Sequence, residues 1–153
     1  MLYGNGIVTG ILLGGCLETI YEAYIGSRFE DEKNIMHKSN ILPTKADRSG
    51  KILFFDTCEH KSTPDELLRM LNELDKLEIF NELNGVLIAK PMDEVYYNEY
   101  KAVYTDFFSK KRVPTLYNLN FGHSAPRCFI PYGIRAEINL DKGAFRLLEN
   151  PFN

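Results

Sequence analysis

The chain reads Gly50-Lys51-Ile52-Leu53-Phe54-Phe55-Asp56-Thr57 at the point that decides its fold. This short apolar run between a glycine and polar residues is typical of a buried strand. The segment Thr63-Pro64-Asp65-Glu66 follows and predicts a helix start. Thr63 serves as N-cap, Pro64 takes the first helical position, and Glu66 completes a capping box. A buried strand followed at once by a helix predicts an α/β domain.

The same alternation extends to both sides of this unit. Strands are expected over residues 7–13 (as a strand or a hairpin), 86–89, 115–119, 134–140 and 145–148, and helices over 16–25 and 93–110. The helix that starts at Thr63 presents a predicted apolar face of Leu67, Leu68, Met70, Leu71, Leu74 and Leu77. Residues 26–50 read as a long surface excursion. The pattern therefore predicts one α/β domain, with its chemistry in the loops that follow strand ends.

Composition narrows the classes of function. The chain has 153 residues, 44% of them hydrophobic, and a net charge of −3, so it offers no basic surface for nucleic acid. Its most apolar stretch, residues 7–15, is too short to cross a membrane and lacks a signal peptide's basic start. The three cysteines (Cys16, Cys58 and Cys128) are widely spaced, so we expect a reducing cytoplasm, no disulfide framework and no metal site.

Two polar residues point to acid–base chemistry. Asp56 ends a buried strand, where a carboxylate is costly unless it is hydrogen-bonded, so it either pairs with a histidine or caps the next turn. His123 lies in the loop 120–126, where its imidazole is either a general base or a turn cap. The neighbouring Ser124 is a poor nucleophile, because adjacent side chains on an extended chain point to opposite sides. No Gly-x-Ser-x-Gly elbow occurs in the sequence. The pattern indicates two-thirds of a charge relay without its serine.

Four segments, in order, carry a resemblance to a known family. They are residues 10–17 (GILLGGCL), 50–59 (GKILFFDTCE), 79–88 (an Ile-Phe and a Gly-Val-Leu-Ile) and 121–133 (FGHSAP, then PYG). Together they resemble the C-terminal domain of the serine LD-carboxypeptidases and of the related peptidases that confer self-immunity to microcin C.

The resemblance implies a single swivelling β/β/α-type domain over residues 1–153, with the N-terminal nucleophile domain absent. It implies that His123 is the base and Asp56 the acid of a Ser-His-acid triad in a cytoplasmic bacterial hydrolase. The implied substrates are murein tetrapeptides or peptidyl-nucleotides, and no cofactor is implied. The family pattern has Glu where this chain has Asp56, one methylene shorter, which predicts a gap of about 1 Å to the imidazole and a loss of rate.

Four further residues are predicted to contact substrate. Gly14 and Gly15 let backbone approach a cleft closely, although a plain strand-to-helix turn explains them equally well. Cys16 follows them, and we expect its thiol to be structural rather than nucleophilic. Glu59 is either a substrate-facing residue or a rival to Asp56 as the acid.

Two functions remain open at this stage. In the first, the chain is the C-terminal half of a serine peptidase, inactive alone because its partner, the nucleophile domain, carries the serine. In the second, it is a non-catalytic module that keeps the fold for binding or dimerisation. A homodimer is possible in either case, because a domain without its partner exposes an apolar patch.

Overall fold

The computed structural model describes residues 1–152, and within them six strands form one sheet in the order β4-β3-β2-β1-β5-β6. The strands are β1 (Ile7–Cys16), β2 (Ile52–Asp56), β3 (Gly85–Ala89), β4 (Thr115–Leu119), β5 (Arg135–Asn139) and β6 (Ala144–Leu147). Strands β1 to β4 pair in parallel, whereas β5 and β6 are antiparallel additions at the β1 edge. The predicted α/β class is confirmed.

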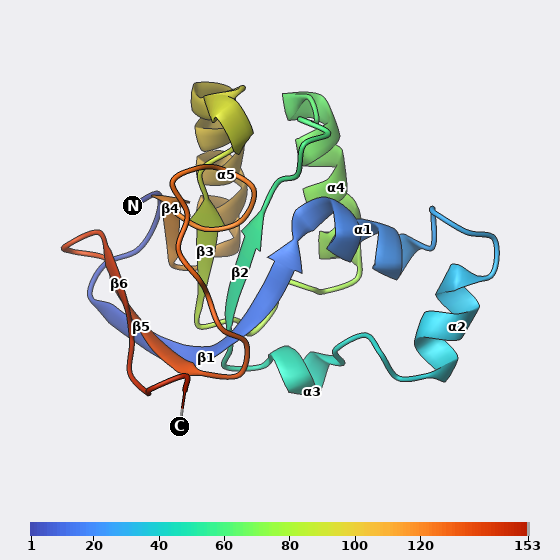
Figure 1. Ribbon diagram of the computed structural model, residues 1–153, viewed down its shortest axis with the longest axis horizontal. Helices are drawn as coiled ribbons and strands as arrows, with labels where there is room; N and C mark the ends of the chain where they lie inside the picture. The colour runs from blue at the N-terminus through green and yellow to red at the C-terminus, as the bar shows by residue number, and fades with distance from the viewer. Residues whose placement is uncertain (153) are drawn as a thin grey trace.

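Strand β1 joins the two parts of the sheet. Its second half pairs with β2, from Leu12 opposite Ile52 to Cys16 opposite Asp56. Its first half pairs with β5 in the opposite sense, so this long strand sweeps from one part of the curled sheet to the other (Figure 1). Residues 7–16 therefore form one continuous strand, and the alternative of a hairpin is wrong.

The helices follow the predicted order with two differences. They are α1 (Leu17–Ile25), α2 (Glu32–Lys38), α3 (Lys45–Arg48), α4 (Pro64–Lys76), the 3-10 turn η1 (Met92–Glu94) and α5 (Tyr97–Lys111). Helix α5 begins later than expected, because Asp93 and Tyr96 take left-handed φ values of 54° and 57° that interrupt a helix. The excursion 26–50 contains two short helices: α2 lies next to α1 and away from the sheet, and α3 lies near the start of β2 (Figure 1).

Alternation along β2 builds a core on each face of the sheet. Leu53 and Phe55 pack with α1, α4 and α5, while Ile52 and Phe54 pack with β5 and the loop after β4. Helix α4 begins as predicted, since Thr63 Oγ1 accepts from Glu66 N at 3.3 Å and Glu66 Oε2 accepts from Thr63 N at 2.7 Å.

The predicted apolar face of α4 is wrong at two positions. Leu68 is 38% exposed, because it lies off the stripe that meets the sheet, and Leu77 is 42% exposed, because the helix ends one residue before it, at Lys76. The remaining four residues of that face are buried. Among the described residues, no helix combines the length and apolar character needed to cross a membrane.

Candidate active site

Asp56 and His123 meet at the carboxyl end of β2. Asp56 is the last residue of the strand and is only 6% exposed. Its Oδ2 lies 2.5 Å from His123 Nδ1 and also accepts a hydrogen bond of 2.8 Å from the backbone N–H of His123. A carboxylate accepts only, so Nδ1 carries a proton, and in the neutral imidazole Nε2 then keeps its lone pair. The structure therefore shows the pairing with a histidine rather than the turn cap.

Gly122 explains how the short acid reaches the imidazole. It has a φ of +78°, and a Cβ placed on it would lie 2.2 Å from Asp56 Oδ2. The loop 120–126 thus approaches the carboxylate more closely than any residue with a side chain allows. Phe121 anchors this loop by packing edge-on against Phe54, with ring centroids 5.9 Å apart. The gap expected from replacing Glu by Asp56 is absent, because the loop lies directly against the shorter side chain.

The other side of the imidazole faces solvent and Glu59. Glu59 Oε2 lies 3.4 Å from His123 Nε2, and the Glu59 side chain is 73% exposed. Asp56 therefore lies on the Nδ1 side of the ring, and Glu59 lies on the Nε2 side. Ser124 is buried, and the structure records no hydrogen bond between its hydroxyl and the imidazole.

The segment 14–16 runs beside the pair. Cys16 lies opposite Asp56 in the register of β1 and β2. Gly14 is required by packing, since a Cβ there would lie 1.7 Å from the Phe54 carbonyl oxygen. Gly15 faces the hydroxyl of Tyr132, which would be 3.2 Å from its Cβ. All three residues and Tyr132 line a pocket of about 260 Å³.

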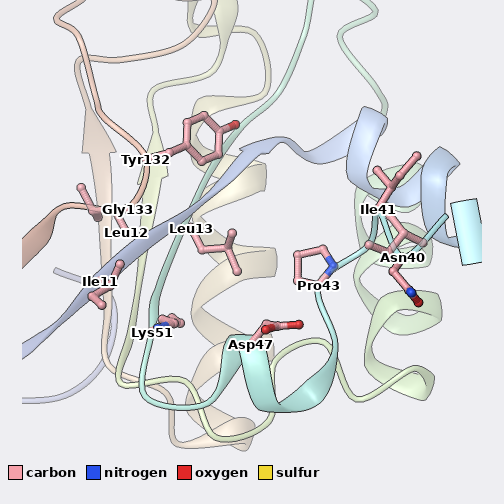
Figure 2. Close-up of a pocket in the computed structure, with 11 residues that line it drawn as sticks. Ile11, Leu12, Leu13, Asn40, Ile41, Pro43, Asp47, Lys51, Tyr132 and Gly133 are labelled. Carbon is pink, nitrogen blue, oxygen red and sulfur yellow. The ribbon is translucent and has the colours of Figure 1, made fainter.

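Tyr132 connects this pocket with a second one. The second pocket, about 340 Å³, lies between β1 and the α3 segment, with Leu13, Pro43 and Lys51 among its lining (Figure 2). The Tyr132 ring lies edge-on to Phe54, 5.1 Å between centroids. Burial and the charge of Asp56 raise the pKa of the Tyr132 phenol, which places this ring within the electrostatic reach of the site.

Two thiols, of Cys16 and Cys58, and the buried carboxylate of Glu18 lie together at the end of the segment 14–16. Cys16 Sγ donates to Glu18 Oε2 at 3.3 Å, and the backbone N–H of Cys58 donates to the same oxygen at 3.2 Å. Burial raises the pKa of the Cys16 thiol to about 12, and the Glu18 carboxylate adds to that rise. Burial also raises the pKa of Cys58. Both thiols are therefore protonated near neutral pH, which agrees with Cys16 not being a nucleophile.

Three residues of the site were not among the predicted ones. Gly122 and Tyr132 occur in the segments that carry the family resemblance, so the signal was present but no role was assigned to either. Glu18 gave a weaker signal, because an acid in the first turn of a helix is ordinary. Its burial depends on contacts with residues about 40 positions away along the chain.

Comparison with known proteins places the fold in a family. The model of the family described as LD-carboxypeptidase C-terminal domain matches residues 9–138. An MccF-like protein from Streptococcus pneumoniae, solved in complex with AMP, is 36% identical to the chain, with a TM-score of 0.89, over 95% of this chain and 42% of that one. No curated protein sequence matches.

Two more distant structures share the fold. MccF in complex with glutamyl sulfamoyl guanosine is 21% identical, with a TM-score of 0.71, over 99% of this chain and 41% of that one. A muramoyltetrapeptide carboxypeptidase from Oxalobacter formigenes is 24% identical, with a TM-score of 0.67, over 95% of this chain and 45% of that one. The chain thus spans less than half the length of each of these three proteins.

Proposed function

This chain belongs to the LD-carboxypeptidase C-terminal domain family, and from that premise we propose that it supplies the acid and the base of a Ser-His-acid hydrolase. Asp56 is the acid and His123 the base in this proposal. The reaction is hydrolysis of an amide bond in a murein tetrapeptide or in a peptidyl-nucleotide. The observation that supports it is the 2.5 Å contact between Asp56 Oδ2 and His123 Nδ1.

The pair has the geometry that general-base catalysis requires. With its proton held on Nδ1 by Asp56, His123 accepts the proton of an attacking serine at Nε2 and later returns it to the leaving amine. The carboxylate stabilises the imidazolium that exists between these two steps. Because Asp56 is buried and held by two hydrogen bonds, the ring keeps one orientation throughout the cycle.

The attacking serine is proposed to come from an N-terminal domain outside residues 1–153. Two observations support this source: Nε2 faces solvent and Glu59, and the matched structures are more than twice as long as the aligned region. A serine that approaches Nε2 displaces Glu59, which then faces the substrate. Backbone amides of the same N-terminal domain are proposed to hold the oxyanion.

Substrate contacts are proposed for the segment 14–16 and for Glu59. Gly15 and Cys16 line a pocket, and Cys16 lies opposite Asp56 in the strand register, so this segment is the part of the pocket lining nearest in register to the acid–base pair. The Cys16 side chain points to Glu18, so its contribution to the cleft is backbone. Gly14 acts indirectly, by letting β1 lie against β2.

The experiment joins residues 1–153 to the serine-bearing N-terminal part of the Streptococcus pneumoniae relative. Release of product from a murein tetrapeptide and from an aspartyl-nucleotide is then measured, with the unjoined chain as a blank. We expect hydrolysis by the joined protein and none by the blank. His123→Ala and Asp56→Asn should each lower kcat by about 10⁴-fold or more, whereas Ser124→Ala should leave it unchanged.

The result also separates the proposal from the second function. If the joined protein binds either substrate, as measured by calorimetry, and His123→Ala changes neither binding nor hydrolysis, the chain is a non-catalytic module. Hydrolysis by the unjoined chain at the rate of the joined protein contradicts the external serine. Glu59→Gln tests the role of the residue next to His123. If Glu59 contacts the substrate, this substitution raises KM, while kcat stays within about tenfold.

A further inference from the structure

Two cysteines and a glutamate from three different segments converge beside the acid–base pair. Cys16 ends β1, Glu18 lies in the first turn of α1, and Cys58 lies in the loop after β2. Their ligand atoms, two sulfurs and one carboxylate oxygen, all lie within 4.8 Å of one another. Parallel pairing of β1 with β2 brings them together, because Cys16 is opposite Asp56 and the chain continues from Asp56 to Cys58.

Glu18 is buried among neutral hydrogen-bond donors. The residue is 8% exposed, and within the part of the chain that the structure describes no ion pair to it is recorded. Its carboxylate accepts only from neutral donors, namely Ser62 Oγ at 3.3 Å, the Cys58 N–H at 3.2 Å and Cys16 Sγ at 3.3 Å. Burying an unpaired carboxylate is costly, and a cation beside it offsets that cost.

We propose that Cys16, Glu18 and Cys58 form a binding site for a thiophilic divalent cation, of which Zn²⁺ is the representative. Two thiolates and one carboxylate are a donor set that suits Zn²⁺, and the sulfur ligands disfavour Mg²⁺ and Ca²⁺. Each thiol releases its proton to solvent when it binds the ion. Three protein ligands leave the fourth tetrahedral position for water or another small ligand.

The surroundings orient the ligands as the outer shell of a metal site does. The backbone N–H of Cys58 and the Ser62 hydroxyl hold the two oxygens of Glu18. Ser62 is itself held, because its carbonyl accepts a hydrogen bond from the buried Tyr100 hydroxyl. Such partners fix the direction of the ligating atoms before the ion arrives.

A cation at this site connects the β1–α1 junction to the loop after β2. That loop follows Asp56 directly and carries Glu59, so bound metal stiffens the segment on which the acid–base pair depends. The proposal does not require the pair to be catalytic, and it is tested without an activity assay.

The test is titration of the full chain with Co²⁺ as a spectroscopic probe for Zn²⁺. Binding to two thiolates produces a sulfur-to-cobalt charge-transfer band in the near ultraviolet, and added Zn²⁺ removes it. We expect saturation at one ion per chain, with loss of the band in Cys16→Ser and in Cys58→Ser. The matched control is Cys128→Ser, which removes the exposed cysteine outside the cluster and should retain the full band.

Thermal unfolding gives a second measurement. At Zn²⁺ one hundred times above its Kd, the Tm should rise by about 5–11 °C in the wild type and in Cys128→Ser, but not in Cys58→Ser. A serine keeps nearly the shape of cysteine, and circular dichroism establishes that each variant is folded before titration. The proposal is overturned if the wild type shows no charge-transfer band, or if the band persists in both Cys16→Ser and Cys58→Ser.

Discussion

Gly122→Ala is the substitution that most directly tests the site geometry. The new Cβ would lie 2.2 Å from Asp56 Oδ2 and 2.3 Å from its Cγ, distances that the two groups cannot share. The loop 120–126 must therefore retreat from β2. Retreat separates the backbone N–H of His123 from the carboxylate and opens the contact between the imidazole and Asp56.

The expected loss of stability has two parts. A left-handed alanine at φ +78° costs about 1–2 kcal/mol relative to glycine. Loss of a hydrogen bond to a charged group adds about 1.5–3 kcal/mol. We therefore expect the free energy of unfolding to fall by about 2.5–5 kcal/mol in Gly122→Ala.

Gly133→Ala is the matched control, because Gly133 has a φ of +74° and nothing within 4 Å of its Cβ position. It should lose only the conformational part, about 1–2 kcal/mol. Any effect of alanine on the unfolded chain is common to both variants. Urea unfolding, followed by near-ultraviolet circular dichroism of the nine tyrosines, measures both losses. Equal losses in the two variants would refute the close approach of Gly122 to Asp56.

Three further outcomes follow from packing and ionisation. Leu71→Ala in α4 should cost about 2–5 kcal/mol, because the side chain is fully buried, whereas Leu68→Ala on the same helix should cost under about 1 kcal/mol; equal costs in urea unfolding would show that the stripe is misplaced. Iodoacetamide should label Cys128 well before Cys16 at neutral pH, since a thiol with a pKa of about 12 is almost wholly protonated; peptide mass mapping that finds Cys16 modified first would contradict this. Burial raises the pKa of Tyr104 above its ordinary value, so the folded state holds that proton more tightly; the contribution of Tyr104 to stability should be constant below about pH 10 and fall above it, and a Tm that does not decline in alkaline buffer would count against it.

Much of the fold was predictable because its signals are local. The β2–α4 unit follows from an apolar run and a capping box, which act between residues a few positions apart. The limits of the buried face of α4 were harder to predict, because Leu68 lies beside the stripe that meets the sheet and Leu77 continues the apolar spacing after the helix ends at Lys76. Hydrophobicity alone does not tell which leucine the sheet covers.

The acid, the histidine and their pairing were predicted from the sequence, but the close approach of the loop that carries the histidine was not. A carboxylate ending a buried strand must find a partner, and that argument selects Asp56 without saying which group it meets. Family resemblance supplied His123. The contact itself depends on a glycine that lets the loop lie against the carboxylate, which is why the shorter acid leaves no gap.

By itself, then, the sequence determined the order of strands and helices and the two residues most suited to acid–base chemistry, because these follow from residue type and short-range spacing. Only the tertiary structure decided what surrounds them. The curl of β1 between two strand partners, the position of Tyr132 beside Phe54, and the approach of Cys58 to Cys16 and Glu18 all arise from contacts between distant segments. Strand register sets such meetings, and register is a property of the assembled sheet rather than of any one stretch of chain.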